Sequence, residues 1–255
     1  MKPIGIPVVS EGETPYLPMP SGMEVYVGPL LPEPEEISPE ARAILSKTRE
    51  ALANGSGKID IGHLGPEDGK GLARILGEGE VGIRAGETMI QESRLTGVWQ
   101  VADSKGGRRI EVGAFPEGVI ARARAFAKGV RLPENLPDGL MNAPSVIAEL
   151  MAKSRAGRRD VVNLTLLPMS YEDMAFIESM LGAGGVTMLS RGYGNCRISS
   201  TRLPDVWWVR YYNSQDALIL DTIEIVDLPE AVRAAPEDIE DSLWRLAEIL
   251  EWVGI

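Results

Sequence analysis

The sequence contains almost no cysteine or histidine, the side chains that most often bind zinc and iron–sulfur clusters. Its 255 residues include one cysteine, Cys196, and one histidine, His63. A single cysteine excludes an intramolecular disulfide, and together the two residues cannot supply a tetrahedral Cys/His zinc site or the ligands of an iron–sulfur cluster. We therefore expect no metal site of these kinds and no bound cofactor, whereas sites built only from carboxylates stay open.

Long apolar segments are also missing. No stretch reaches the roughly 18 consecutive apolar residues that a membrane-spanning helix needs. The first twenty residues contain one lysine, several prolines and two glutamates, and lack the apolar core and cleavage site of a secretory signal. The composition predicts a soluble cytoplasmic protein without a membrane span.

Positive charge is scarce, and the formal net charge is -11. Residues 1–40 carry seven glutamates against Lys2, and residues 227–255 carry eight acidic residues against two arginines. The one basic run, residues 153–159, lies where a helix should end, and cations are favourable there. We therefore favour a structural role for this run over a nucleic-acid site, and predict no binding to nucleic acid.

Three segments of the first half recur in the same order in the second half. The matched pairs are ILGEGEVGI with MLGAGGVTM (75–83 with 180–188), IQESRLTGVWQV with ISSTRLPDVWWV (90–101 with 198–209), and IEVGAFPEGV with IEIVDLPEAV (110–119 with 223–232). The spacing between the copies grows from 105 to 108 to 113 residues, which indicates short insertions in the loops of the second copy. The order of the matches predicts an internal duplication.

Each copy shows the same succession of patterns. A short apolar run typical of a strand precedes a helix that ends at Gly77 or Gly182, which we expect to be left-handed caps. Several strands follow, and a helix near Pro116 or Pro229 ends the unit. The predicted unit is β-α-β-β-β-β-α. The fold class is therefore α+β, with two tandem units, mainly antiparallel or mixed sheets, and helices on one face.

Four regions follow from this assignment. Residues 1–53 form an N-terminal arm and a helix that starts at Ser38-Pro39. Residues 54–130 form the first, diverged repeat, and residues 131–160 form a linker and a helix. Residues 161–255 form the second repeat and end in a helix after Pro236.

The turn between two strands of the second repeat is the best candidate for a binding site. It has the sequence Arg191-Gly-Tyr193-Gly-Asn195-Cys196-Arg197, which differs from the first repeat. Two arginines beside Cys196 are compatible with a reactive thiol of lowered pKa, but a core-facing cysteine at the start of a strand is the simpler interpretation. The nearby glycines 182, 184 and 185 lack the spacing of a phosphate-binding loop.

A second candidate surface lies on the strand Val206-Trp207-Trp208-Val209-Arg210. Trp207 matches Trp99 and is expected in the core, whereas Trp208 replaces Gln100. Trp208 and Arg210 share one face of the strand, and together they form either a partner-binding surface or a site under the N-terminal arm.

Four long motifs closely resemble the HupH/HyaF/HoxQ family of hydrogenase expression proteins. They are NLTLLPMS (163–170), LSRGYGNCRISST (189–201), VWWVRYYNS (206–214) and LILDTIEIVDLPE (218–230). The resemblance is strong over residues 160–250 and looser over 55–130. It implies an accessory protein of uptake [NiFe] hydrogenase maturation, without catalytic residues to transfer.

The resemblance further implies a non-enzymatic chaperone that binds the hydrogenase small-subunit precursor before export, together with a second accessory protein. The acidic ends of the chain suit a basic twin-arginine signal peptide. The partner-binding residues expected are Arg191, Tyr193, Asn195, Cys196, Trp208 and Arg210. One alternative is a thiol-dependent factor in which Cys196 handles sulfur or an iron–sulfur cluster. Another is a scaffold for a different accessory protein.

Overall fold

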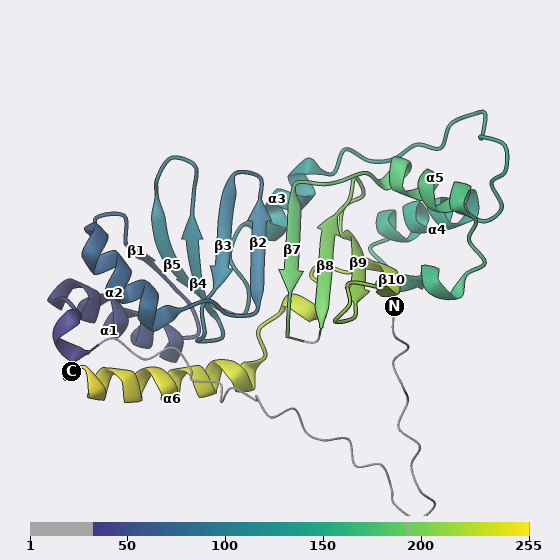
Figure 1. The fold of residues 1–255 in the computed structure, drawn as a ribbon. Helices are drawn as coiled ribbons and strands as arrows, with labels where there is room; N and C mark the ends of the chain where they lie inside the picture. Colours follow the sequence, from purple (N-terminus) through teal and green to yellow (C-terminus); the bar gives the residue numbers. More distant parts are fainter. Residues whose placement is uncertain (1–32, 193, 255) are drawn as a thin grey trace, which may run out of the picture. The chain divides into compact units, whose positions relative to one another are not determined.

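The computed structural model describes residues 33–192 and 194–254, and their arrangement is shown in Figure 1. Ten strands form one sheet in the order β1-β5-β4-β3-β2-β7-β8-β9-β10-β6, and every neighbouring pair is antiparallel. The strands are β1 (Gly57–Asp60), β2 (Val81–Ala85), β3 (Thr88–Glu92), β4 (Val98–Ala102), β5 (Arg108–Val112), β6 (Asp160–Asn163), β7 (Val186–Ser190), β8 (Asn195–Ser200), β9 (Val206–Tyr212) and β10 (Leu218–Ile225).

Six α-helices accompany the sheet in the described part of the chain. They are α1 (Pro39–Ala53), α2 (Pro66–Leu76), α3 (Val119–Phe126), α4 (Ala143–Arg155), α5 (Tyr171–Leu181) and α6 (Pro236–Trp252). Three short 3₁₀ helices are also present: η1 (Pro34–Glu36), η2 (Leu164–Leu166) and η3 (Glu230–Val232). The α+β class is confirmed, and the strands form a single sheet rather than several.

The centre of the sheet is the pairing of β2 with β7. Ile83 lies opposite Met188, with two further residue pairs on each side of this central pair. Moving outward from β2, the strands are β3, β4, β5 and β1, and moving outward from β7 they are β8, β9, β10 and β6. The two five-stranded halves of the sheet therefore have the same strand order.

Cross-strand partners lie on the same face of a sheet, so the pairing register assigns each side chain to a face. One face, here called the groove face, carries two rows of residues that run from β5 to β10. The first row is Ile110, Gln100, Gln91, Gly82, Leu189, Arg197, Arg210 and Asp221, and the second is Arg108, Ala102, Met89, Arg84, Thr187, Ser199, Trp208 and Ile223.

Helices cover both ends of the groove face and leave its middle open. Helices α1 and α2 pack over the end formed by β1 and β5, and α4 and α5 cover the end formed by β9 and β10 (Figure 1). The opposite face is covered at its centre by α3 and η3. The expectation that all helices lie on one face is therefore wrong. The buried apolar side chains of the central strands point to the face opposite the groove face, so that face needs helices as cover as well.

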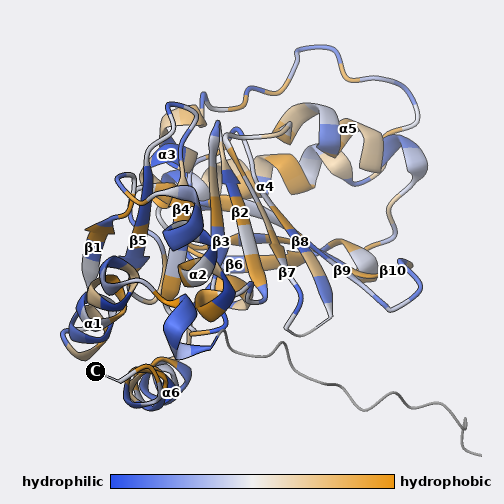
Figure 2. Ribbon diagram, turned by 60° about the vertical axis from the view of Figure 1, so that its left-hand side comes forward, coloured by the Kyte–Doolittle hydropathy of each residue, from blue (hydrophilic) through white to orange (hydrophobic). Residues whose placement is uncertain are grey.

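Three apolar cores result from this layering. The first lies between α1, α2, α6 and the β1–β5 end, and Figure 2 shows apolar sides of α1 and α6 near each other. The second lies on the face opposite the groove face and contains Trp99 and Trp207, whose indole N–H groups donate to the carbonyls of Gly113 and Val226. The third lies under α4 and α5. The two matched tryptophans are fully buried, as the sequence predicts.

Several helix boundaries follow directly from the local sequence. Ser38 caps α1, and Ser170 with Asp173 forms the capping box of α5. Helices α2 and α5 end at Gly77 and Gly182, both with φ +57°. Their ψ values of -165° and -178° are not those of left-handed caps, so that detail of the expectation is wrong. This backbone region is essentially restricted to glycine.

The end of the second half differs from the sequence prediction. Pro229 is followed only by the three-residue helix η3, not by an α-helix. The chain then continues into α6, which begins at Pro236 as predicted and packs against α1 of the first half. The basic run begins in the last turn of α4, and two of its residues form ion pairs: Lys153 contacts Glu149 and Asp160, and Arg159 contacts Asp227.

Candidate functional site

The turn that the sequence highlights lies between β7 and β8. Arg191 follows β7 and is exposed, and its backbone N–H donates to the Glu80 carbonyl at 3.1 Å. Asn195 begins β8 opposite Tyr212 and is partly exposed. Tyr193 lies outside the described residues. The turn is therefore accessible, and its two described polar residues stand beside the groove face.

Cys196 is not part of that accessible surface. Its side chain is 2 % exposed and lies in the core on the face opposite the groove face, beside Tyr211. Burial raises the pKa of the Cys196 thiol to about 11, although a hydrogen bond with Tyr211 acts in the opposite direction. The structure thus opposes the lowered pKa that the neighbouring arginines suggested, because their charges lie outside the apolar environment that the sulfur occupies.

Trp208 and Arg210 lie on the groove face and contact each other. The guanidinium carbon of Arg210 is 4.1 Å from the centroid of the Trp208 ring, which is a cation–π contact. The Trp208 indole N–H donates to Asp221 Oδ1, and Arg210 Nε lies 3.6 Å from Asp221 Oδ2. Burial raises the pKa of Asp221, although Trp208 and Arg210 favour its charged form. Trp208 is only 6 % exposed, so the accessible part of this cluster is Arg210.

Two cavities open on the groove face, one in each half of the sheet, and residues 187–189 of β7 line both. The first cavity has a volume of about 680 Å³ and lies between α2 and the strands of the first half. The second has a volume of about 570 Å³ and lies between α5 and the strands of the second half, with Trp208 and Arg210 in its wall. Both are within the size range of small-molecule and side-chain binding pockets.

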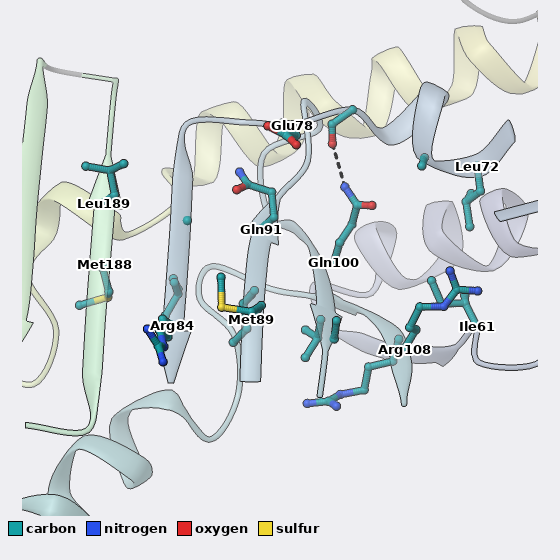
Figure 3. Close-up of a pocket in the computed structure, with 18 of the residues that line it drawn as sticks. Ile61, Leu72, Glu78, Arg84, Met89, Gln91, Gln100, Arg108, Met188 and Leu189 are labelled. Carbon is teal, nitrogen blue, oxygen red and sulfur yellow. Dashed lines mark hydrogen bonds between the residues drawn. The ribbon is translucent and has the colours of Figure 1, made fainter. Parts of the chain in front are cut away.

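The wall of the first cavity is mainly apolar (Figure 3). Ile61, Leu72, Met89 and Leu189 line it, and the Met89 side chain is 56 % exposed. Gln100 also lines the cavity, and its amide N–H donates to the Gly77 carbonyl at 2.7 Å. The apolar part of this wall suits a large apolar side chain.

Arginines surround the open part of the groove face. Arg84 and Arg108 line the first cavity, Arg197 lines the second, and all three are exposed. Arg197 stacks on Tyr212, with its guanidinium carbon 4.8 Å from the ring centroid. Glu78 is the acidic residue in the wall of the first cavity. The groove face therefore combines apolar surface with positive charge, although the whole chain is acidic.

The first cavity is not evident from the sequence alone. Its walls come from residues 61–109 and 187–189, which are distant in the chain and meet only when β2 pairs with β7. A signal was nevertheless present, because the matched segments carry Gly82 against Thr187 and Gln100 against Trp208. At both matched positions the first half has the smaller residue, and this difference indicates free space on the groove face of the first half.

Among residues 33–192 and 194–254, no cluster of three or more His, Cys, Asp or Glu side chains is placed to hold a metal ion. In the same ranges, none of the helices combines the length and hydropathy that crossing a bilayer requires.

Comparison with known proteins decides the family. Residues 140–253 match the family described as HupH hydrogenase expression protein, C-terminal conserved region. The whole chain is 46 % identical to the hydrogenase expression/formation protein HoxQ of Cupriavidus necator, over 99 % of that protein. The chain belongs to the HupH hydrogenase expression protein family.

Other members of the HupH family cover most of the chain as well. The hydrogenase expression/formation protein HupH of Rhodobacter capsulatus is 46 % identical over 92 % of this chain and 90 % of its own length. The hydrogenase-1 operon protein HyaF of Escherichia coli K12 is 31 % identical over 85 % of this chain and 82 % of its own length. The resemblance inferred from the four motifs is confirmed, and it extends over the first half.

Proposed function

We propose that this member of the HupH family is a non-enzymatic maturation chaperone of uptake [NiFe] hydrogenase that binds the small-subunit precursor in the cytoplasm. The observation that carries the proposal is the 46 % identity, over essentially the whole length of both chains, to a protein named for hydrogenase expression and formation. The open groove face gives such a chaperone a binding surface of suitable chemistry.

Two surfaces of the described chain suit different parts of a precursor. The groove face carries arginines and apolar side chains. Of the predicted contact residues, Arg210 lies on this face, and Arg191 and Asn195 lie beside it. Helix α6 instead exposes six acidic residues together with Trp244 and Trp252. A basic twin-arginine signal peptide is complementary in charge to α6. The proposal therefore assigns the signal peptide to α6 and the mature part of the subunit to the groove face.

We also propose that the two halves of the sheet are copies of one duplicated unit. This duplication is supported by the equal strand order of the two halves, by the central Ile83–Met188 pair, whose members are 105 residues apart as the repeats are, and by the matched tryptophan contacts. Helices α1 and α4 precede the first strand of each half, so the proposed unit is one helix longer than the β-α-β-β-β-β-α pattern.

The thiol-dependent alternative has less support. A sulfur that relays sulfide or meets a cluster needs access and a populated thiolate, whereas Cys196 is buried and its pKa is raised to about 11. The scaffold alternative, in which the protein binds only a second accessory protein, uses the same surfaces and is separated from chaperoning by experiment.

The deciding measurement is co-purification of the tagged full-length protein with the small-subunit precursor, made with and without its signal peptide. We expect capture of both forms, with stronger capture of the form that retains the signal. Loss of the signal-dependent part when the exposed acids of α6 are changed to amides would assign that part to α6. Failure to capture either form would contradict the chaperone role and leave the scaffold role.

A matched substitution tests the thiol alternative in the same assay. Cys196→Ser is expected to leave precursor capture and hydrogenase activity nearly unchanged once protein levels are equalised, because the sulfur has no chemical role in the proposal. Abolished hydrogenase activity with normal folding and normal capture would instead favour the thiol-dependent factor.

A further inference from the structure

The first cavity lies where the second half of the sheet has larger side chains. Equivalent positions follow from the sheet register and from the glycines that end α2 and α5. At five of them the first half has the smaller residue: Gly69 for Met174, Ala73 for Glu178, Gly82 for Thr187, Gln100 for Trp208, and Ala102 for Arg210. Five positions in the wall of the first cavity thus carry smaller residues than their counterparts in the second half, where four of the larger residues line the second cavity.

The second half shows which chemistry occupies this place. There the indole of Trp208 is buried against the sheet, Arg210 stacks on it, and Asp221 accepts the indole N–H and faces Arg210. An aromatic ring and a cation–carboxylate pair therefore pack together at this position of the fold. These contacts within the protein show which ligand groups would be favourable at the equivalent place in the first half: an aromatic ring next to a charged pair.

The charged pair is altered in the first half. Arg210 lies opposite Asp221 in the second half, whereas Ala102 lies opposite Arg108 in the first. The Arg108 guanidinium donates to the Leu64 carbonyl at 3.3 Å, and within the described ranges it forms no ion pair. A Cβ atom at Gly69 would lie 3.4 Å from Arg108 Nη1, so the glycine leaves room beside this cation. Arg108 is thus available to a carboxylate from outside.

We infer that the first cavity binds a segment of the partner in which a bulky aromatic side chain adjoins an acidic residue, the ring filling the apolar space and the carboxylate pairing with Arg108. The inference rests on the proposed function, and it assigns the groove face to an acidic, aromatic part of the small-subunit precursor. Arg84 adds positive charge on the same face, which disfavours the basic signal peptide at this site.

The test uses the full-length protein and the unlabelled peptide acetyl-Gly-Trp-Asp-Gly-Gly-amide, with binding measured by isothermal titration calorimetry. The double variant Ala102→Arg with Arg108→Asp rebuilds the pair that Arg210 and Asp221 form in the second half, so it is expected to fold. We expect it to bind the peptide at least about tenfold more weakly than the unmodified protein. Arg155→Ala, an exposed change remote from the cavity, is the matched control and should bind normally.

Peptide chemistry provides the second arm. Replacing the peptide's tryptophan by glycine, or its aspartate by lysine, should each weaken binding by a similar factor. Equal binding of all three peptides, or normal binding to the double variant, would overturn the inference. Displacement of the peptide by a synthetic peptide of residues 1–32 would assign the cavity to this chain's own N-terminus and overturn it as well.

Capture of the precursor by the double variant separates this inference from the proposed function. Weakened capture together with weakened peptide binding supports both. Normal capture by the double variant rejects the cavity as the precursor site and leaves the chaperone role intact. If the unmodified protein captures no precursor, the proposed function fails and the cavity is not a precursor site, whatever the peptide shows.

Discussion

Glu92, at the end of β3, shows how a single buried group can set the response of this protein to pH. Its side chain is buried on the face opposite the groove face, and Oε1 accepts from the Gly97 N–H at 3.4 Å. Burial raises the pKa of Glu92 to about 7, and the negative charges of Glu80 and Asp238 act in the same direction. The matched position in the second half carries Ser200, so this cost is confined to the first half.

The sign of the resulting pH dependence follows from the two pKa values. Between the ordinary glutamate pKa of about 4.5 and the folded value of about 7, the folded protein binds a proton that the unfolded chain has lost. The contribution of Glu92 to stability therefore falls as the pH rises through this range, and above pH 7 the full cost of about 3 kcal/mol is present.

Glu92→Gln should remove this cost. We expect the free energy of unfolding, measured in urea, to rise by up to about 3 kcal/mol at pH 8, because the amide still accepts from Gly97 and carries no charge. At pH 5 the gain should be much smaller. Glu78→Gln, at an exposed position, is the control for the loss of one negative charge. A gain equal at both pH values would contradict the proposed titration.

At the scale of elements, Asp173 joins the start of two helices. Its carboxylate accepts from the Ser170 N–H within the capping box of α5, and also from the N–H groups of Met141, Asn142 and Ala143 at the start of α4. Burial by itself would raise the pKa of Asp173, but these four backbone donors outweigh it and the pKa is lowered. One side chain thus satisfies donors of both α4 and α5.

Asp173→Ala should therefore destabilise the chain more than an ordinary loss of a helix cap. We expect a decrease of about 3 kcal/mol in the free energy of unfolding in urea, since several charge-assisted hydrogen bonds are lost and buried N–H groups lose their acceptor. Asp173→Asn should lose less because one acceptor remains. The neighbouring Glu172→Ala is the control, and an equal effect of both alanine variants would refute the role of Asp173.

At the scale of the whole described fold, the β2–β7 pairing joins the two halves. The pairing is centred on Ile83 and Met188, with two residue pairs on each side. A second copy of β7 could therefore pair with β7 in the place of β2, centred on its own Met188. Helix α3 packs against both strands at the junction. Without the first half, β7 would be an open edge, and open edges pair with other strands.

Residues 133–234, which contain the second half without α6, are therefore expected to form a dimer through antiparallel β7–β7 pairing. Helix α6 is omitted because its apolar side packs against α1. Sedimentation velocity over a range of concentrations measures the dimer, with the full-length protein run alongside. A fragment that keeps its β-sheet circular dichroism and stays monomeric at every concentration would show that the edge of β7 is not sufficient for pairing.

The sequence by itself determined most of the elements and their order, with the helix expected at Pro229 as the exception. Periodic apolar residues, the prolines and serines at helix starts, and glycines with positive φ act over a few residues, so their consequences can be predicted without the fold. The start of α1 at Pro39, the capping box at Ser170 and the burial of Trp99 and Trp207 are of this kind. The family resemblance also rested on contiguous motifs.

Only the tertiary structure decided which strands meet and which side chains share a space. The pairing of β2 with β7 joins segments about a hundred residues apart, and no local pattern specifies it. That pairing brings together the walls of the first cavity, and strand alternation places Cys196 and Trp208 on opposite faces although both lie in the motifs that suggested a site. The physical reason is that a binding site depends on burial, face and register, which are properties of the assembled sheet.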